Sequence, residues 1–350
     1  MPTEELTRTE GAKTGGMLVH SLSYISMLRA GARRLGRSPS TGILFILLFL
    51  CGLLWLTCPE TFPTADNLFA VARSFSYIAV TAIGELMVII IGGIDLSVGS
   101  VMGFSAILTG WLMYRLATPI PLAILCGLSG GAAFGLFNGF CVTRLHLPAF
   151  IATLGTMCIG RGLAYAITKG YTVPVPRAYA NLGQGYLGLV PYPVICMVGL
   201  GLIFAVFLGR TVIGRRIYAL GGNEEAAKIS GIDVPGVKML VFTLSGLLAG
   251  AGGILCSARL GVAQSTLALG YELDVIAAVF IGGASTVGGS GTVLGTILGA
   301  AIMGVIRNGL VLLSVDPYWV QTAIGSVIIL AVAFDRFRLQ YRDRRGAKGR

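Results

Sequence analysis

The sequence predicts an all-α protein: a polytopic transmembrane helical bundle of about ten membrane segments with both termini in the cytoplasm. Three observations lead to this fold class. Only 12% of the 350 residues are charged, whereas soluble domains carry roughly 25%. Hydrophobic residues make up 55% of the chain, and the mean hydropathy is +0.83. Glycine contributes 51 residues without a collagen-like period. Such a chain has too little polar surface for a water-soluble globule, which excludes a soluble enzyme.

Residues 1–41 are expected to form a basic arm on the cytoplasmic side. Six Lys and Arg residues precede the first membrane-length apolar run, whereas a cleavable signal would place its apolar stretch directly after a short basic region. Leu18, Leu22, Ile25 and Leu28 recur at helical spacing. This spacing fits either a helix lying on the membrane surface or a loosely ordered tail.

Residues 42–335 form the expected membrane domain. A full span needs about 20 apolar residues, so several of the segments are short. The one at 272–286 fits a re-entrant segment buried in protein as well as a span. The ten segments lie near 42–57, 69–91, 97–115, 120–142, 149–168, 190–209, 238–258, 272–286, 291–311 and 318–335.

The distribution of basic residues supports an even number of spans. With the N-terminus inside, the arm, Arg144, a loop at 210–238 and a basic tail at 336–350 all lie in the cytoplasm and hold 19 of the 26 Lys and Arg residues. The first loop on the opposite side, 58–67, holds none. Basic residues favour the cytoplasmic face of a membrane. The net charge of +11 therefore indicates orientation in lipid and not nucleic-acid binding.

Glycine patterns inside the segments predict close helix packing. Small residues let helix backbones approach one another in lipid, and two rows of them run through 127–139 and 246–253. A separate pattern, Ile91-Gly92-Gly93, recurs at 281–283. Transporters often contain repeats, but in a glycine-rich chain this echo fits chance equally well.

No metal, redox or nucleotide centre is expected. The seven cysteines are scattered without a CxxC pair, and His20 and His146 are the only histidines. Buried thiols are the simplest interpretation of such cysteines. No GxxxxGK[ST] phosphate loop occurs, the nearest fragment being Gly11–Thr14. The chain is therefore expected to carry no cofactor and to hydrolyse no ATP itself.

The loop at 210–238 stands out because the other connections are expected to be short. Asn223, which follows Gly221 and Gly222, is a favourable N-cap, and Gly231 suits a left-handed helix stop. Between them, acidic residues come first, then good helix formers and a basic residue, the order that suits a helix dipole: Glu224, Glu225, Ala226, Ala227 and Lys228. The predicted short helix is either an ordinary surface helix or a shape that fits a groove on a cytoplasmic partner.

Several motifs together resemble bacterial ATP-binding-cassette permeases of the ribose, xylose and arabinose type. They occur in the family's order between about 70 and 335. The residues that carry the resemblance are Gly92–Gly99, Pro148–Gly155 with Arg161-Gly162, Gly222-Asn223 with Ala226-Ala227 and Ser230-Gly231-Ile232, Phe242–Gly246, and Ala277–Gly283 leading to Gly288-Gly289.

The resemblance implies a permease subunit in the bacterial inner membrane that pairs with a second copy or a paralogue. It implies that a separate ATPase subunit drives transport of a monosaccharide-like solute, which a solute-binding protein delivers from outside. The ATPase would dock on the 210–238 loop through Gly222, Asn223, Glu224, Glu225, Ala226, Ala227, Ser230 and Gly231. The alternatives are a branched-chain amino-acid permease of the same class and a self-contained secondary transporter. A membrane enzyme would need a nucleophile–base or metal-ligand cluster, which the sequence lacks.

Four polar residues in the apolar regions are candidates for the translocation path or its gate: Glu85, Asp95, Ser97 and Asn138. A charge at membrane depth costs about 2.5–3.5 kcal/mol, so each needs a reason. Asp95 either caps the helix that follows it or contacts solute. Glu85 either pairs with Arg161 or lies on the path. Asn138 either binds sugar hydroxyls or ties two helices together.

Overall fold

The computed structural model describes residues 39–316 and isolated positions between 318 and 333. Most of the expected basic arm, including the spacing at 18–28, lies outside the described residues, and so does the tail at 336–350. The expected segment at 318–335 lies largely outside them as well.

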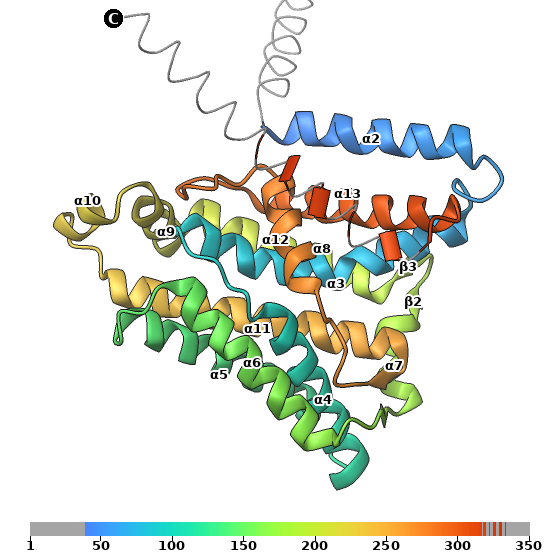
Figure 1. Ribbon diagram of the computed structural model, residues 1–350, viewed down its shortest axis with the longest axis horizontal. Coiled ribbons are helices and arrows are strands. Elements are labelled where there is room, and N and C mark those ends of the chain that lie inside the picture. The colour runs from blue at the N-terminus through green and yellow to red at the C-terminus, as the bar shows by residue number, and fades with distance from the viewer. Residues whose placement is uncertain are drawn as a thin grey trace, which may run out of the picture.

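Helices dominate the described chain (Figure 1). The nine helices that coincide with expected membrane segments are α2 (Pro39–Thr57), α3 (Ala65–Ile90), α4 (Val98–Leu116), α5 (Ile120–Thr143), α6 (Ala149–Thr168), α8 (Tyr192–Arg210), α11 (Val234–Leu260), α12 (Tyr271–Ile281) and α13 (Val293–Leu312). Three further helices lie between them: α7 (Arg177–Gln184), α9 (Val212–Gly222) and α10 (Glu224–Ile229).

Six helices within the described residues are long and apolar enough to cross a membrane: α3, α5, α6, α8, α11 and α13. In α3, α11 and α13, 83%, 67% and 61% of the apolar window is buried, against 28% in each of the other three. The first three therefore form the interior, and α5, α6 and α8 present apolar side chains outward. The protein is a polytopic helical membrane protein, as the sequence predicts.

The count of ten spans stays a prediction. Helix α12 has 11 residues, which at 1.5 Å per residue rise only about 16 Å and cannot cross a hydrocarbon core of about 30 Å. Helix α12 is therefore too short to be a membrane span by itself.

Helix α11 runs through the middle of the bundle, with α4, α5 and α6 on one side and α3, α13 and α2 on the other (Figure 1). The two glycine rows meet where α11 crosses α5. A Cβ added at Gly135 would overlap the carbonyl oxygen of Phe242, and one added at Gly131 would overlap that of Gly246. The prediction of close packing at these rows is confirmed, because only the missing side chains let the two backbones touch.

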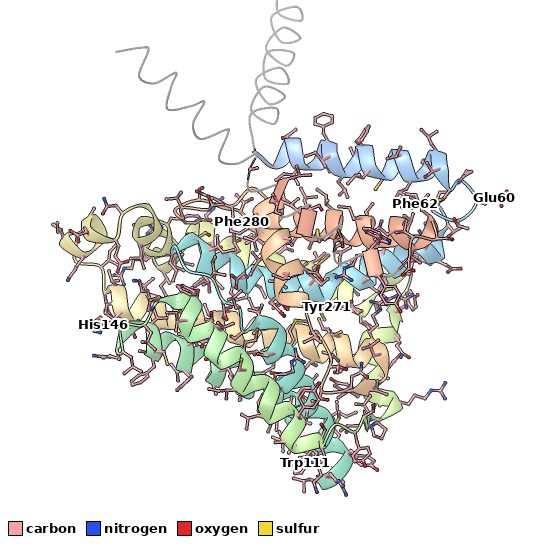
Figure 2. All side chains as sticks on the ribbon, in the orientation of Figure 1. Glu60, Phe62, Trp111, His146, Tyr271 and Phe280 are labelled. Atoms are coloured by element: carbon pink, nitrogen blue, oxygen red, sulfur yellow. The ribbon has the colours of Figure 1, made fainter. Side chains whose placement is uncertain are left out.

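The two ends of the bundle carry different connections. Figure 2 shows Glu60 and Phe62 at one end and His146 at the other; helices α9 and α10 lie at the His146 end and α7 at the opposite end (Figure 1). We call these the α10 end and the α7 end. The predicted separation of the 58–67 loop from Arg144 and the 210–238 loop is therefore present in the fold.

The expectation of short connections outside 210–238 is wrong at the α7 end. Residues 169–191 hold α7 and three short strands, β1 (Val173–Pro174), β2 (Tyr186–Leu187) and β3 (Val190–Pro191). Strand β1 pairs antiparallel with β4 (Val262–Ala263), and β2 pairs with β3. The hydroxyl of Tyr179 in α7 donates to the Ile254 carbonyl at 3.0 Å, which fastens this segment to α11.

The glycine echo at 91–93 and 281–283 marks the same helix-ending turn in two places. At the end of α3 the Gly92 and Gly93 amides donate back to Ile89 and Val88, and Gly92 has a φ of 80°. At the end of α12, Gly283, with a φ of 83°, and Ala284 donate to Phe280 and Val279 in the same way. The two turns correspond with a shift of one residue relative to the sequence echo, and a positive φ explains why glycine is used in both.

Candidate functional site

The predicted helix after Asn223 is present as α10. The Asn223 side chain accepts from the Ala226 amide at 2.9 Å, and Gly231 ends the segment with a φ of 78°. Lys238, in the first turns of α11, forms an ion pair with Glu224 at 2.7 Å. Helix α10 is therefore a rigid projection whose orientation relative to α11 is fixed from both ends.

The two alanines of α10 face opposite ways, which corrects the expectation that both lie on the docking surface. Ala226 is exposed, whereas Ala227 is 3% exposed and packs into the main hydrophobic core. The large apolar side chain on the outer surface is Ile229, which is 87% exposed. Which of the two adjacent alanines is buried could not be read from the sequence of a six-residue helix without knowing which side meets the core.

A backbone junction just before α10 was missed at the sequence level. The Ile90 carbonyl at the end of α3 accepts from the Gly289 amide at 2.8 Å. Gly221, near the end of α9, lies against both groups, and a Cβ added there would overlap the Ile90 oxygen. The Tyr218 hydroxyl donates to the Gly291 carbonyl at 2.8 Å, and partial burial raises the pKa of Tyr218. Helix α9 is thereby joined to the end of α3, where a non-helical break at 91–97 begins, and to a second non-helical break, 282–292, between α12 and α13.

The four residues predicted to lie on the path form one buried cluster. They come from α3, from α5 and from the non-helical break at 91–97 between α3 and α4. Glu85, Asp95, Ser97 and Asn138 are each at most 1% exposed. In this conformation they line no open passage.

Asp95 organises this cluster by accepting hydrogen bonds. Its Oδ1 accepts from the Ser97 amide at 2.9 Å and the Ser97 hydroxyl at 2.5 Å, and its Oδ2 accepts from the Ser245 hydroxyl of α11 at 3.2 Å. The expected capping role is displaced: Ser97 occupies the N-cap of α4 and makes no side-chain cap bond. Asp95 lies two residues earlier and fixes the turn that leads into the helix.

Glu85 does not pair with Arg161, so that expectation is wrong. Glu85 Oε1 accepts from the Asp95 amide at 3.0 Å. Arg161 instead donates to the Ser265 and Leu267 carbonyls at 2.6 and 2.9 Å. The chain of the break folds back along α3, which brings a backbone amide to Glu85 ten residues earlier.

Asn138 ties two helices together. Its Nδ2 donates to the Ser97 hydroxyl at 2.9 Å, joining α5 to the start of α4. Thr153 ties α6 to the residue before Ser97, because the Thr153 hydroxyl accepts a hydrogen bond from the Leu96 amide at 3.2 Å. Thr153 lies within the Pro148–Gly155 motif but was not singled out, because a threonine in an apolar run gives no signal of its own.

A cleft of about 370 Å³ lies between this break and α10. Its lining includes Gly92, Gly93, His146, Glu224 and Lys238. The start of the break, the turn before α6, helix α10 and the start of α11 therefore share one concave face at the α10 end.

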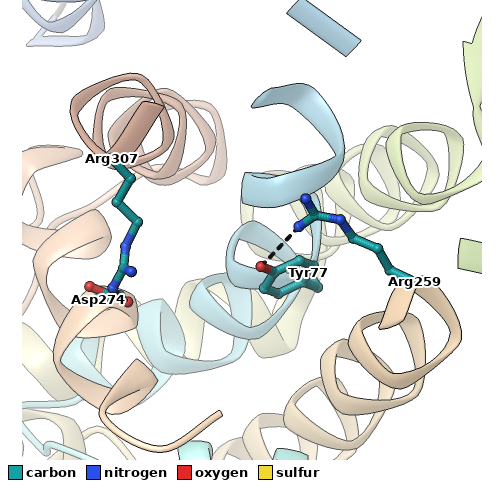
Figure 3. A network of polar contacts seen from close by, with 4 residues as sticks. All are labelled: Tyr77, Arg259, Asp274 and Arg307. Carbon is teal, nitrogen blue, oxygen red and sulfur yellow. Dashed lines mark hydrogen bonds and ion pairs between the residues drawn. The ribbon is translucent and has the colours of Figure 1, made fainter. Parts of the chain in front are cut away.

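A second polar network lies toward the α7 end and joins four helices (Figure 3). Arg259 of α11 donates to the Tyr77 hydroxyl of α3 at 3.2 Å, and Arg307 of α13 pairs with Asp274 of α12. The Tyr77 ring stacks on that of Tyr271 with centroids 5.9 Å apart. This network is not visible in the sequence, because its partners lie on four different helices.

Comparisons with known proteins identify a family and several relatives of the chain. The family described as "Branched-chain amino acid transport system / permease component" matches residues 67–332. The ribose import permease RbsC of Haemophilus influenzae is 39% identical over 83% of this chain and 91% of that protein. The D-allose permease AlsC of Escherichia coli is 37% identical over 84% and 91%. The L-arabinose permease AraH of Azospirillum brasilense is 33% identical over 86% and 89%. No solved structure matches the chain.

Proposed function

Because the chain belongs to the family of permease components of branched-chain amino acid transport systems, which includes relatives named as sugar import permeases, we propose that it imports a monosaccharide-like solute. The observation that carries this proposal is the extent of the similarity. Relatives named for ribose and allose align with more than four fifths of the chain. The family description favours a second candidate, a branched-chain amino acid.

The chain is a multi-pass inner-membrane protein, and we assign its α10 end to the cytoplasm. The basic residues of the 210–238 loop and Arg144 lie at this end, and basic residues favour the cytoplasmic face. The α7 end, with its cap of α7 and four short strands, then faces the solute-binding protein. A second permease copy or a paralogue completes the passage.

The docking site for a separate ATPase subunit is the exposed surface of α10, with Ile229 as its apolar anchor. A large aliphatic side chain that is 87% exposed on a rigid projection suits burial in a groove of a partner. Movement of α10 reaches the membrane interior through α9, because Gly221 joins α9 to the end of α3 at Ile90 and Tyr218 joins it to the break at 282–292.

The buried cluster around Asp95 is the proposed gate. Its hydrogen bonds hold the break at 91–97 against α3, α5, α6 and α11. A shift of the break relative to α3 has to exchange these bonds as a group, because an unpaired buried polar group is costly. The cluster therefore favours two discrete arrangements, as alternating access requires.

Reconstitution tests the proposal. The chain is placed in liposomes with and without its ATPase and solute-binding subunits, and uptake of radiolabelled ribose, allose, arabinose and leucine is measured. We expect ATP-dependent uptake of a pentose or hexose only in the complete system, and no ATP hydrolysis by the chain alone. Leucine uptake would instead favour the amino-acid permease, and uptake driven by a proton or sodium gradient without the ATPase would favour a secondary transporter.

A further inference from the structure

The segment Gln264–Gly270 re-enters the bundle from the α7 end without forming a helix. The chain leaves α11 at Leu260, pairs through β4 with β1, and then turns back inward. It reaches Tyr271, whose ring stacks on Tyr77. Tyr77 lies twelve residues after Ala65, the start of α3, or about 18 Å along that helix. The segment therefore descends to a depth at which its neighbours are continuous helices.

Arg161 holds this segment in place from α6. It donates to the Ser265 and Leu267 carbonyls and lies seven residues before Thr168, where α6 ends. Gly103 of α4 is also close to the Leu267 carbonyl, which a Cβ at that position would crowd at 2.9 Å. Carbonyls that a helix would satisfy internally are here satisfied by a charged side chain from another helix.

Part of this non-helical segment faces outward. Thr266 is exposed, Leu269 is 63% exposed, and Leu273 in the first turn of α12 is 44% exposed. Irregular backbone facing lipid does not occur within the hydrocarbon region, because its polar groups would find no partners. At membrane depth such a surface is either covered by protein or lines a water-filled cavity.

Two charges at the same place favour water. Arg161 and Glu272 are both only half-buried, and they interact electrostatically with each other. Glu272, the second residue of α12, lies against Gly99 at the beginning of α4, where an added Cβ would overlap the Glu272 carboxylate. Two helices thus start at one point inside the bundle. Starts of broken helices at this depth are where transporters commonly bind solute.

We propose that Arg161, Thr266, Leu269, Glu272 and Leu273 form a face, the re-entrant face, that lines the solute path. Glu272 and Arg161 there hydrogen-bond the hydroxyl groups of a polyhydroxylated solute. A carboxylate supplies acceptors and a guanidinium supplies donors, which together match a hydroxyl that both donates and accepts. This assignment rests on the proposed function for the class of solute, but its accessibility test does not.

Single cysteines at Thr266 and Leu269 test whether water reaches the face. They are introduced into the complete transporter in membranes, and labelling by a charged thiosulfonate is measured above that of the parent chain. The control is Leu202→Cys, on α8, whose side chain is 64% exposed on a continuous helix. We expect labelling at Thr266 and Leu269, slowed several-fold by the transported solute, and none at Leu202. Absence of labelling at both positions, as cover by a second copy would give, overturns the proposal, and so does labelling that solute leaves unchanged.

Glu272 is tested by Glu272→Gln and Glu272→Asp in the reconstituted complex. Loss of a charge-assisted hydrogen bond to the solute predicts that Glu272→Gln raises the half-saturation concentration for uptake roughly tenfold, with ATPase assembly and thermal stability unchanged, and that Glu272→Asp partly restores it. The matched control is Glu60→Gln, an exposed carboxylate in the connection between α2 and α3. An unchanged half-saturation concentration for Glu272→Gln overturns the solute contact. If the wild-type complex imports leucine instead of sugar, the proposed function fails while the labelling result stands.

Discussion

Gly221 lies directly against the carbonyl oxygen of Ile90, the same oxygen that accepts a hydrogen bond from Gly289. Gly221 thus joins α9, the helix before α10, to the end of α3 and to the connection between α12 and α13. The next residue, Gly222, has no atom within 4 Å of where its Cβ would be. The two neighbouring glycines therefore differ completely in what a methyl group would meet.

Gly221→Ala is expected to destabilise the junction, because the new methyl group overlaps backbone that cannot rotate away. Overpacking of this kind costs about 1–3 kcal/mol. We expect a lower thermal unfolding temperature in detergent and a loss of ATP-driven uptake. Gly222→Ala is the matched control for stability and should leave the unfolding temperature unchanged, because no atom lies within 4 Å of the added methyl group. Equal behaviour of the two variants would show that the junction does not constrain the protein.

Ile229→Glu should break the complex with the ATPase without weakening the permease. The side chain is 87% exposed, so the substitution removes little from the permease's own packing. Affinity purification of the ATPase with the permease measures assembly, and unfolding of the isolated permease measures stability. Ile229→Val should retain the complex. Ala227→Glu, in contrast, should lower the stability of the isolated permease, because Ala227 is only 3% exposed and the new carboxylate would be buried. Full assembly by Ile229→Glu would remove α10 from the docking site.

Asp95→Ala should destabilise the protein more than Asp95→Asn. The alanine leaves the Ser97 amide and the Ser97 and Ser245 hydroxyls without their acceptor, and each unsatisfied buried group costs about 1–3 kcal/mol. Asparagine keeps one carbonyl oxygen for the Ser97 groups. Thermal unfolding of both variants and of Ser245→Ala, which removes a single bond, gives the order. An Asp95→Ala variant as stable as the wild type would exclude a structural role for the cluster.

Cysteines placed at Glu60 and Gly222 should label from opposite sides of the membrane. Glu60 and Gly222 are exposed at the α7 and α10 ends, respectively. An impermeant reagent added to right-side-out vesicles should reach the cysteine at position 60, and the one at 222 only after permeabilisation. Labelling of position 222 in intact vesicles would reverse the assignment of the α10 end to the cytoplasm.

Composition and local pattern were enough to predict the class of fold and several of its details. Apolar run lengths located the membrane helices, because transfer of backbone into lipid demands continuous apolar helix. Asn223 and Gly231 predicted the two ends of α10, because a cap bond and a left-handed residue act within a few residues of chain. The glycine rows predicted close helix packing for a similar reason, because the absence of a side chain is visible in sequence, but only the structure showed that the two rows pack against each other.

Partnerships between distant residues were decided only by tertiary structure. The sequence left open whether Glu85 pairs with Arg161 or lies on the solute path. In the structure, a fold-back of the break gives Glu85 a backbone amide, and the segment Gln264–Gly270 gives Arg161 two carbonyls. Ala226 and Ala227 are equivalent in composition, and the packing of α10 against the core separates an exposed side chain from a buried one. Gly221 and Gly222 differ in what an added methyl group would meet, because only Gly221 lies against the end of α3 and the connection between α12 and α13. Charge, size and helix propensity are properties of a single residue. Its hydrogen-bond and packing partners depend on where the rest of the chain lies.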